Sequence, residues 1–280
     1  MIDKLVLLCP VIRREIETLA LQRGQQTSSY ERCLDLRYTS LALPVRLYIG
    51  GRRNGHHKAE FIGVATLGLP RTTEIAELLF PDLRQVRIYR IDLCTDLLGI
   101  PPSFFLLNAV IPRRQNYALF RSRSGTSFYL EFSRQRRTLF YDRGRFLRKK
   151  SHPLAKVFGH SQLTRVEIQM SGAAVPFRRF QDFSAYAEFD PLAGIRFMKL
   201  SIADRTRTPV KQLAAFGLRW FIRRHGQQAT SRMFPSSAWS AIQKTYLRTM
   251  EASDIPAIRR SMRESTRRWL AGQILFPRAK

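Results

Sequence analysis

The sequence has 280 residues, of which 44% are hydrophobic, and 48 Lys and Arg against 21 Asp and Glu give a formal net charge of +27. Such an apolar fraction excludes a disordered basic tail, because a disordered chain lacks the apolar surface that offsets the entropy cost of ordering. Charges interrupt every apolar run before the roughly 18 residues of a membrane span, and the N-terminus does not resemble a secretory signal.

The cysteines indicate a reducing compartment. Cys9, Cys33 and Cys94 are scattered, and they form neither a CxxC pair nor an even disulfide framework. We therefore expect a folded, strongly basic cytoplasmic protein without membrane association.

The excess charge points to a polyanionic partner. Of the 48 basic residues 39 are arginines, whose planar guanidinium matches phosphate oxygens and stacks on bases. Aromatic residues are interleaved with them, as in the stretch 113–123, which suits a surface that binds backbone phosphates and unpaired bases. Charge alone favours nucleic acid. A ribosome-associated protein and contact with anionic lipid are the alternatives.

Residues 1–70 have the composition of strands. Apolar stretches lie at 4–8, 34–43, 45–49 and 59–68, and the Gly/Asn cluster at 50–55 predicts a hairpin turn between the last two. A helix is expected from Pro70, with a Thr cap near Glu74.

The middle of the chain continues with strands at 87–97 and 163–170, a hairpin over 126–142 and a helix from Pro101 to Pro112. After residue 199 the pattern changes, and three helices are expected at 209–224, 236–250 and 255–274. Residues 205–280 contain 16 Lys and Arg but 3 Asp and Glu. We predict an α+β fold, with a central antiparallel sheet and helices on one face in residues 1–204, followed by a basic helical region over 205–280.

Two strands carry acidic side chains on one face. A period of two places Arg90, Asp92, Cys94 and Asp96 together on the first strand, and it places Glu167 beside Arg165 and Gln169 on the second. If the strands are neighbours, Asp92 and Glu167 approach each other, and two such carboxylates favour a hard cation such as Mg²⁺ or Mn²⁺. The alternative is an antiparallel sheet with one wet face, which shows the same alternation.

Other chemistries lack their motifs. The histidines form no metal-binding pair, and zinc sites, a P-loop, a dinucleotide fingerprint and a Gly-x-Ser-x-Gly elbow are absent from the sequence.

Three segments taken in order resemble the replication initiation factor (Rep_trans-type) family. They are Arg90-Ile91-Asp92-Leu93, then Tyr129…Ser133…Leu139-Phe140-Tyr141-Asp142-Arg143-Gly144, and finally Arg165-Val166-Glu167-Ile168-Gln169-Met170. This family includes rolling-circle plasmid initiators, related conjugative relaxases and, more distantly, filamentous-phage initiators. The resemblance covers about residues 1–200 and implies an endonuclease that nicks one DNA strand at an origin with a divalent cation and a tyrosine nucleophile. Arg143 stands where the family usually has lysine.

The resemblance implies roles for particular residues. Asp92 and Glu167 would bind Mg²⁺ or Mn²⁺, with Asp96 or Asp142 as further ligands. The family's nucleophile lies on a basic helix downstream of the Arg-x-Glu strand, and Tyr246 in the stretch 237–248 is similar to it. Its attack would leave a 5′-phosphotyrosine and a free 3′-hydroxyl. Tyr186 is the second choice, and an amphipathic helix with Tyr246 as a core-edge aromatic is the alternative.

The resemblance also implies the partners: origin DNA, single-stranded or supercoiled, with a host helicase and a second copy of the chain, in the cytoplasm of a bacterial host cell. Basic residues expected at DNA are Arg143, Arg165, Lys244, Arg248, Arg223, Arg224, Arg259 and Arg260. The rival hypothesis is a DNA- or RNA-binding protein on the same scaffold that does not cleave.

Overall fold

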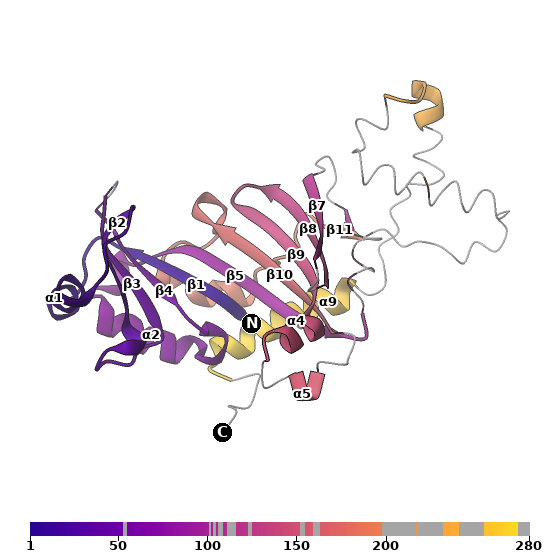
Figure 1. Cartoon of the computed structure of the whole chain (residues 1–280). Coiled ribbons are helices and arrows are strands. Elements are labelled where there is room, and N and C mark those ends of the chain that lie inside the picture. Colours follow the sequence, from indigo (N-terminus) through magenta and orange to yellow (C-terminus); the bar gives the residue numbers. More distant parts are fainter. Residues whose placement is uncertain are drawn as a thin grey trace. The chain divides into compact units, whose positions relative to one another are not determined.

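The chain folds into two compact units, each assembled from separate stretches (Figure 1). The first unit comprises Met1–Thr95, Glu167–Pro191 and Arg260–Lys280, and the second comprises Asp96–Val166 and Leu192–Arg259. The computed structural model describes residues 1–52, 55–100, 102, 105, 109–110, 116–122, 125–151, 155–158, 163–197, 217, 232–240 and 255–273.

An antiparallel sheet organises the first unit, with the strand order β2-β3-β4-β1-β5-β10. Its strands are β1 (Ile2–Cys9), β2 (Tyr30–Asp35), β3 (Val45–Gly51), β4 (His57–Phe61), β5 (Arg87–Leu98) and β10 (Leu163–Ser171). The last residues of β5 and the first of β10 belong to the second unit. The α-helices are α1 (Arg14–Arg23), α2 (Gly68–Leu79) and α9 (Ile255–Leu270), and 3₁₀ turns lie at η1 (Leu36–Tyr38), η2 (Val64–Thr66), η3 (Leu83–Gln85), η4 (Gly172–Ala174) and η5 (Phe180–Ala187).

Helix α9 covers the apolar face of this sheet, as Figure 1 shows for the strands of the first unit. The hydroxyl of Thr95 on β5 lies 2.9 Å from that of Ser261 on α9. Trp269, near the end of the helix, is 1% exposed, donates a 2.8 Å hydrogen bond to the carbonyl of Val64 and stacks on Phe183. Because Thr95 shares its face of β5 with Leu93, the even-numbered Asp92 lies on the opposite, polar face.

The second unit contains an antiparallel meander and short helices. Strands β7, β8 and β9 pair antiparallel in sequence, β10 follows β9 in the sheet order, and β6 pairs with β11. Its elements are β6 (Ala109–Val110), β7 (Asn116–Ser122), β8 (Gly125–Ser133), β9 (Arg136–Asp142), α4 (Arg143–Lys149), α5 (Ala155–Phe158) and β11 (Arg196–Phe197).

The structure confirms the predicted α+β fold with an antiparallel sheet, and it confirms the strands at β1, β3, β5 and β10, the β8–β9 hairpin and helix α9. Apart from α9, the helices predicted after residue 199 lie mostly outside the described residues. The proposed boundary at residue 204 also lies there and stays a prediction. Residues 260–280, on the far side of that boundary, belong to the first unit with residues 1–95. None of the helices in the described part of the chain has the length and apolarity of a membrane span.

Several local predictions are wrong. Residues 14–23 form a helix rather than a strand, because Ile16 and Ala20, four residues apart, bury one helical face. Helix α2 begins at Gly68, whose φ of +71° favours glycine, and no side chain caps it. Ala109–Val110 are a strand and not the end of a helix, since they pair with β11.

We expect Trp269→Ala to lower the free energy of unfolding by about 3–5 kcal/mol, because it removes a large buried ring. Trp269→Phe keeps the ring contact but leaves the Val64 carbonyl without its donor, so a smaller loss of about 1–2 kcal/mol is expected. Urea unfolding followed by circular dichroism measures both. Arg268→Ala on the exposed side of α9 is the control and should change stability by less than about 0.5 kcal/mol. Equal effects of Trp269→Ala and Arg268→Ala would contradict the packing described.

Candidate active site

A cavity of about 480 Å³ opens on the polar face of the first unit's sheet. It receives side chains from β1, β3, β4, β5 and β10, and we call it the carboxylate cavity. Four carboxylates and four cationic side chains line it, and its described lining is Asp3, Lys4, Arg37, Arg46, Glu60, Phe61, Ile62, Arg90, Asp92, Glu167 and Gln169.

An irregular pairing brings two consecutive residues of β1 to this cavity. In a regular strand Asp3 and Lys4 would face opposite sides. The register against β5 shifts between Ile2 and Lys4, which pair with Leu93 and Asp92, so Asp3 is an extra residue in the ladder. Such a bulge re-aims a side chain, and both Asp3 and Lys4 line the cavity.

Asp92 is a buried carboxylate held by a guanidinium. It is 2% exposed, and Arg90 donates to both of its oxygens, from Nε at 2.9 Å and from Nη2 at 2.7 Å. Burial raises the pKa of Asp92, and the hydrogen bonds from Arg90 oppose the rise. The same hydrogen bonds raise the pKa of Arg90, and the field of Glu167 adds to the effect.

Glu167 is the second buried carboxylate, at 7% exposure. The amide of Gln169 donates a 2.7 Å hydrogen bond to its Oε1. The strand alternation therefore places Asp92 and Glu167 in one cavity, as the sequence predicts. Within the described residues no group of three or more His, Cys, Asp or Glu side chains is arranged to hold a metal ion.

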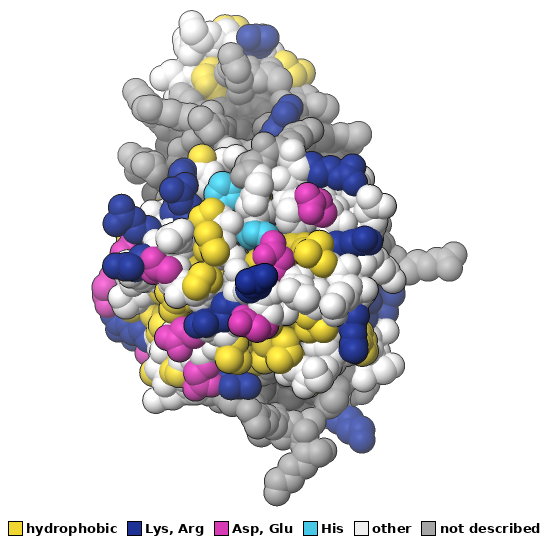
Figure 2. All heavy atoms as spheres, turned by 90° about the vertical axis from the view of Figure 1, so that its left-hand side faces the viewer, with side chains coloured by type: hydrophobic (Ala, Val, Ile, Leu, Met, Phe, Trp, Pro, Cys, Tyr) yellow, Lys and Arg dark blue, Asp and Glu magenta, His cyan; other side chains and the backbone are white. Residues whose placement is uncertain are grey.

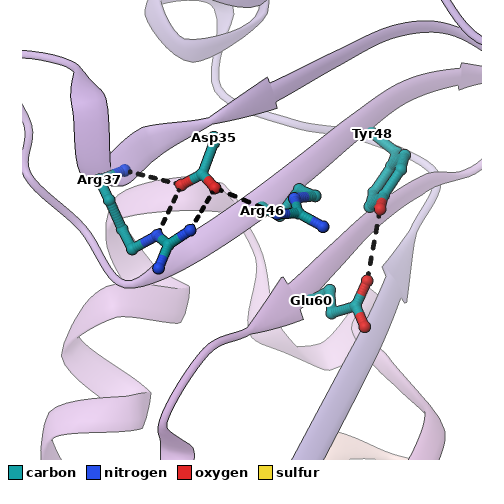
Figure 3. Close-up of polar contacts among 5 residues, drawn as sticks. All are labelled: Asp35, Arg37, Arg46, Tyr48 and Glu60. Carbon is teal, nitrogen blue, oxygen red and sulfur yellow. Dashed lines mark hydrogen bonds and ion pairs between the residues drawn. The ribbon is translucent and has the colours of Figure 1, made fainter. Parts of the chain in front are cut away.

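A chain of polar contacts continues across the same face toward the sheet edge (Figure 3). Asp35 accepts two hydrogen bonds from the Arg37 guanidinium, at 2.9 and 2.7 Å, and one from Arg46 at 3.4 Å. Tyr48 donates to Glu60 at 3.4 Å.

Glu60 also forms a 2.6 Å ion pair with Lys4. Burial is the largest single effect and raises the pKa of Glu60, but the pair with Lys4, the charge of Lys58 and the hydrogen bond from Tyr48 together lower it. The cations around the cavity are thus partly matched by carboxylates within the fold.

Asp96 and Arg165 pair with each other in the second unit. Arg165 is 1% exposed and donates from Nε and Nη2 to the two oxygens of Asp96, both at 2.7 Å. The burial of this guanidinium argues against the predicted DNA contact of Arg165. Asp96 does not line the carboxylate cavity, and the structure gives no support to it as a metal ligand.

Asp142 begins a helix. Its Oδ1 accepts a 2.8 Å hydrogen bond from the backbone N–H of Arg145, which makes Asp142 the N-cap of α4. This contact accounts for the position of Asp142, and its predicted role as a metal ligand stays a prediction. Arg143, the next residue, is half-buried, with its guanidinium 5.0 Å from the ring centre of Phe146.

Tyr186 lies in the core of the first unit. It is 1% exposed, packs against the rings of Phe177, Phe183 and Phe189, and donates to the carbonyl of Phe177 at 3.2 Å. Burial raises its pKa well above the ordinary value. A nucleophile needs access to DNA and an ionisable hydroxyl, so this environment argues against Tyr186.

The other predicted residues fall into two groups. Tyr246, Lys244, Arg248, Arg223 and Arg224 lie outside the described residues, so their roles stay predictions. Arg259 and Arg260 lie on α9, where Arg259 is half-buried and Arg260 exposed. On the face shown in Figure 2 basic and acidic side chains are intermixed rather than segregated.

The sequence analysis missed Asp3, Lys4, Arg46 and Glu60. The alternation of apolar and polar residues in 45–49 and 57–61 could have indicated Arg46 and Glu60. No sequence pattern predicts the bulge at Asp3.

No protein-family model and no curated protein matches the chain. One similar solved structure is described as a rolling circle replication initiator protein from Geobacillus stearothermophilus. It is 14% identical, the alignment covers 78% of this chain and 95% of that chain, and the TM-score is 0.44. A likeness at this level shows neither a shared family nor a shared function.

We expect Asp35→Asn to lower the free energy of unfolding at pH 7 by about 1 kcal/mol, a figure reduced for solvent screening. The hydrogen bond from Arg37 is the main cause that holds the pKa of Asp35 at about 2, below its ordinary 3.8. Stabilisation from a depressed carboxylate pKa is complete above the unfolded value and is lost as the pH falls through the folded value.

Urea unfolding is measured at pH 7 and at steps down to about pH 2. The free energies of unfolding of wild type and Asp35→Asn should converge between about pH 4 and pH 2. Glu74→Gln, which breaks the exposed pair with Arg71, is the control and should change little at any pH. A deficit of Asp35→Asn that persists unchanged at pH 2 would show that the ion pair is not its cause.

Proposed function

We propose that this protein nicks and rejoins one strand of DNA at an origin by a tyrosine transesterification that uses a divalent cation. The observation that carries the proposal is the pair of buried carboxylates, Asp92 and Glu167, which come from separate strands and face one cavity lined also by cations. Carboxylates with low exposure on a polar sheet face are costly unless a cation compensates them.

The residues of the cavity fit Mg²⁺ or Mn²⁺. Mg²⁺ is commonly bound through one or two protein carboxylates, with waters and substrate phosphates completing the shell, so two suffice. Each ionised carboxylate offers about four lone-pair positions, and the two bonds from Arg90 leave acceptor capacity on Asp92. When bound, the cation would polarise the scissile phosphate and offset the charge that develops on it.

The protein's own groups would hold the substrate. Lys4, Arg37, Arg46 and Arg90 supply positive charge around the carboxylates and would bind the phosphates on either side of the scissile bond. Tyr246 is our candidate nucleophile. Its phenol oxygen would bond to phosphorus as the phenol proton leaves, while the bond to the 3′-oxygen breaks and that oxygen takes up a proton. The product is a 5′-phosphotyrosine and a 3′-hydroxyl, and the reverse reaction rejoins the strand.

A binding protein without cleavage is the second candidate. Both oxygens of Asp92 are already held by Arg90, an arrangement that neutralises the carboxylate without a metal ion. On this hypothesis the carboxylates stabilise the fold, and the arginines alone account for DNA affinity.

We expect Tyr246→Phe to abolish a covalent protein–DNA adduct, because the variant lacks the attacking oxygen. Denaturing gels of labelled single-stranded and supercoiled DNA libraries, with Mg²⁺ or Mn²⁺, measure the adduct. Tyr38→Phe, at an exposed tyrosine, is the matched control and should form it normally. Loss of the adduct in Tyr186→Phe but not in Tyr246→Phe would reassign the nucleophile.

Asp92→Asn and Glu167→Gln should each lower the metal-dependent adduct rate by about 100-fold or more, since each removes a charged ligand. Mn²⁺ titrations in the absence of DNA, monitored by calorimetry or electron paramagnetic resonance, should show that the same variants bind Mn²⁺ more weakly than wild type. Glu74→Gln is the control. If wild type binds DNA in a salt-sensitive way but forms no adduct on any library with either metal, the binding-protein hypothesis is preferred.

A further inference from the structure

A second cavity, of about 530 Å³, lies on the first unit farther along the same strands. We call it the tyrosine cavity. Its described lining is Leu8, Ser28, Ser29, Tyr30, Gly51, Arg52, Lys58 and Tyr89. None of these residues is acidic, so it differs from the carboxylate cavity, where four carboxylates face four cations.

The two cavities share one face of the sheet. Lys4 and Leu8 are four residues apart on β1, and Lys58 and Glu60 are two apart on β4, so each pair points to the same side. One member of each pair lines each cavity. Four residues of a strand span about 13 Å, a length that a few nucleotides of an extended strand cover.

Two tyrosines from different strands line the tyrosine cavity. Tyr30 comes from β2 and is half-buried, while Tyr89 comes from β5 and is 46% exposed. The register of β5 shifts beside Tyr89: Arg90 pairs with Val6 and Ile88 with Leu7, which leaves Tyr89 as the extra residue. An aromatic ring exposed at a bulge, next to a cavity, offers a flat surface for stacking.

Lys58 is held at a fixed place in this cavity. Its ammonium lies 3.6 Å from the ring centre of Tyr48 and 5.3 Å from that of Tyr30. Burial lowers the pKa of Lys58. Among the described residues no ion pair of Lys58 is seen; the two aromatic rings attract its ammonium, and the charge of Glu60 acts on it as well. A phosphate would find a desolvated cation here, with Arg52 and the hydroxyls of Ser28 and Ser29 beside it.

We propose that the tyrosine cavity binds an unpaired base of single-stranded nucleic acid, stacked on Tyr89, with the adjoining phosphate on Lys58 and Arg52. The inference rests on the proposed function in one respect: the strand that fills this cavity continues into the carboxylate cavity. Stacking on an aromatic ring tolerates every base, and cations beside it track the backbone. A base inside an intact duplex cannot enter, so the cavity selects unpaired strands.

Fluorescence anisotropy with a labelled single-stranded oligonucleotide of random sequence tests the proposal on the full chain. Tyr89→Ala should weaken binding about tenfold, and Tyr89→Phe should bind like wild type, because stacking needs the ring and not the hydroxyl. Arg52→Ala should lower the slope of log affinity against log salt by about one. Leu78→Ala, which truncates an exposed side chain of α2 outside both cavities, is the control and should have no effect.

Duplex affinity and photocrosslinking test whether the effect is specific to unpaired strands in this cavity. Tyr89→Ala should leave the affinity for a duplex of the same sequences unchanged, and photocrosslinking with 5-iododeoxyuridine strands should label Tyr89 or Tyr30. Equal single-strand affinity of wild type and Tyr89→Ala, or crosslinks confined to other peptides, overturns the proposal. Failure of the proposed nicking appears separately, as absence of a covalent adduct while these binding differences persist.

Discussion

The ion pair between Arg90 and Asp92 determines which face of the first unit's sheet is polar. A carboxylate that is 2% exposed requires a compensating charge, and the guanidinium two residues earlier on β5 reaches both of its oxygens. Since alternation commits Arg90 and Asp92 to one side of the strand, the hydrophobic residues of β5 occupy the other side, where α9 covers them. The division between a buried apolar face and a charged face follows from this spacing.

Irregularities in strand pairing then decide which side chains gather on the charged face. A regular ladder would turn Asp3 and Tyr89 away from Lys4 and Arg90, their neighbours in the chain. The two register shifts between β1 and β5 instead supply an extra side chain at each cavity. The shift at Asp3 adds one carboxylate to the carboxylate cavity, and the shift at Tyr89 adds an uncharged ring to the tyrosine cavity.

Much of this arrangement could be predicted from sequence, because a period of two along β5 and β10 specifies which residues share a face. The period indicated which face Asp92 and Glu167 take, but their meeting also required β5 and β10 to be neighbours in the sheet. The local contacts of Asp142 and Arg165 could not be predicted, because sequence does not distinguish a helix cap from a metal ligand, or a buried pair with Asp96 from a surface cation. The contributions of Asp3 and Tyr89 depend on bulges, which arise from packing between strands distant in sequence.

The two cavities differ in how they would treat a polyanion. In the carboxylate cavity four carboxylates offset four cations, so the side chains alone give a DNA strand little net attraction despite the chain's charge of +27. On the proposed function, Asp92 and Glu167 would hold a divalent cation, whose charge would make this cavity attractive to phosphate. The tyrosine cavity, with Arg52 and Lys58, is attractive without a metal ion. On the proposed function the tyrosine cavity would retain a strand by stacking and cation contacts, while Asp92 and Glu167 would hold the cation that cleavage requires. Binding and cleavage would then depend on separate residues of one sheet face.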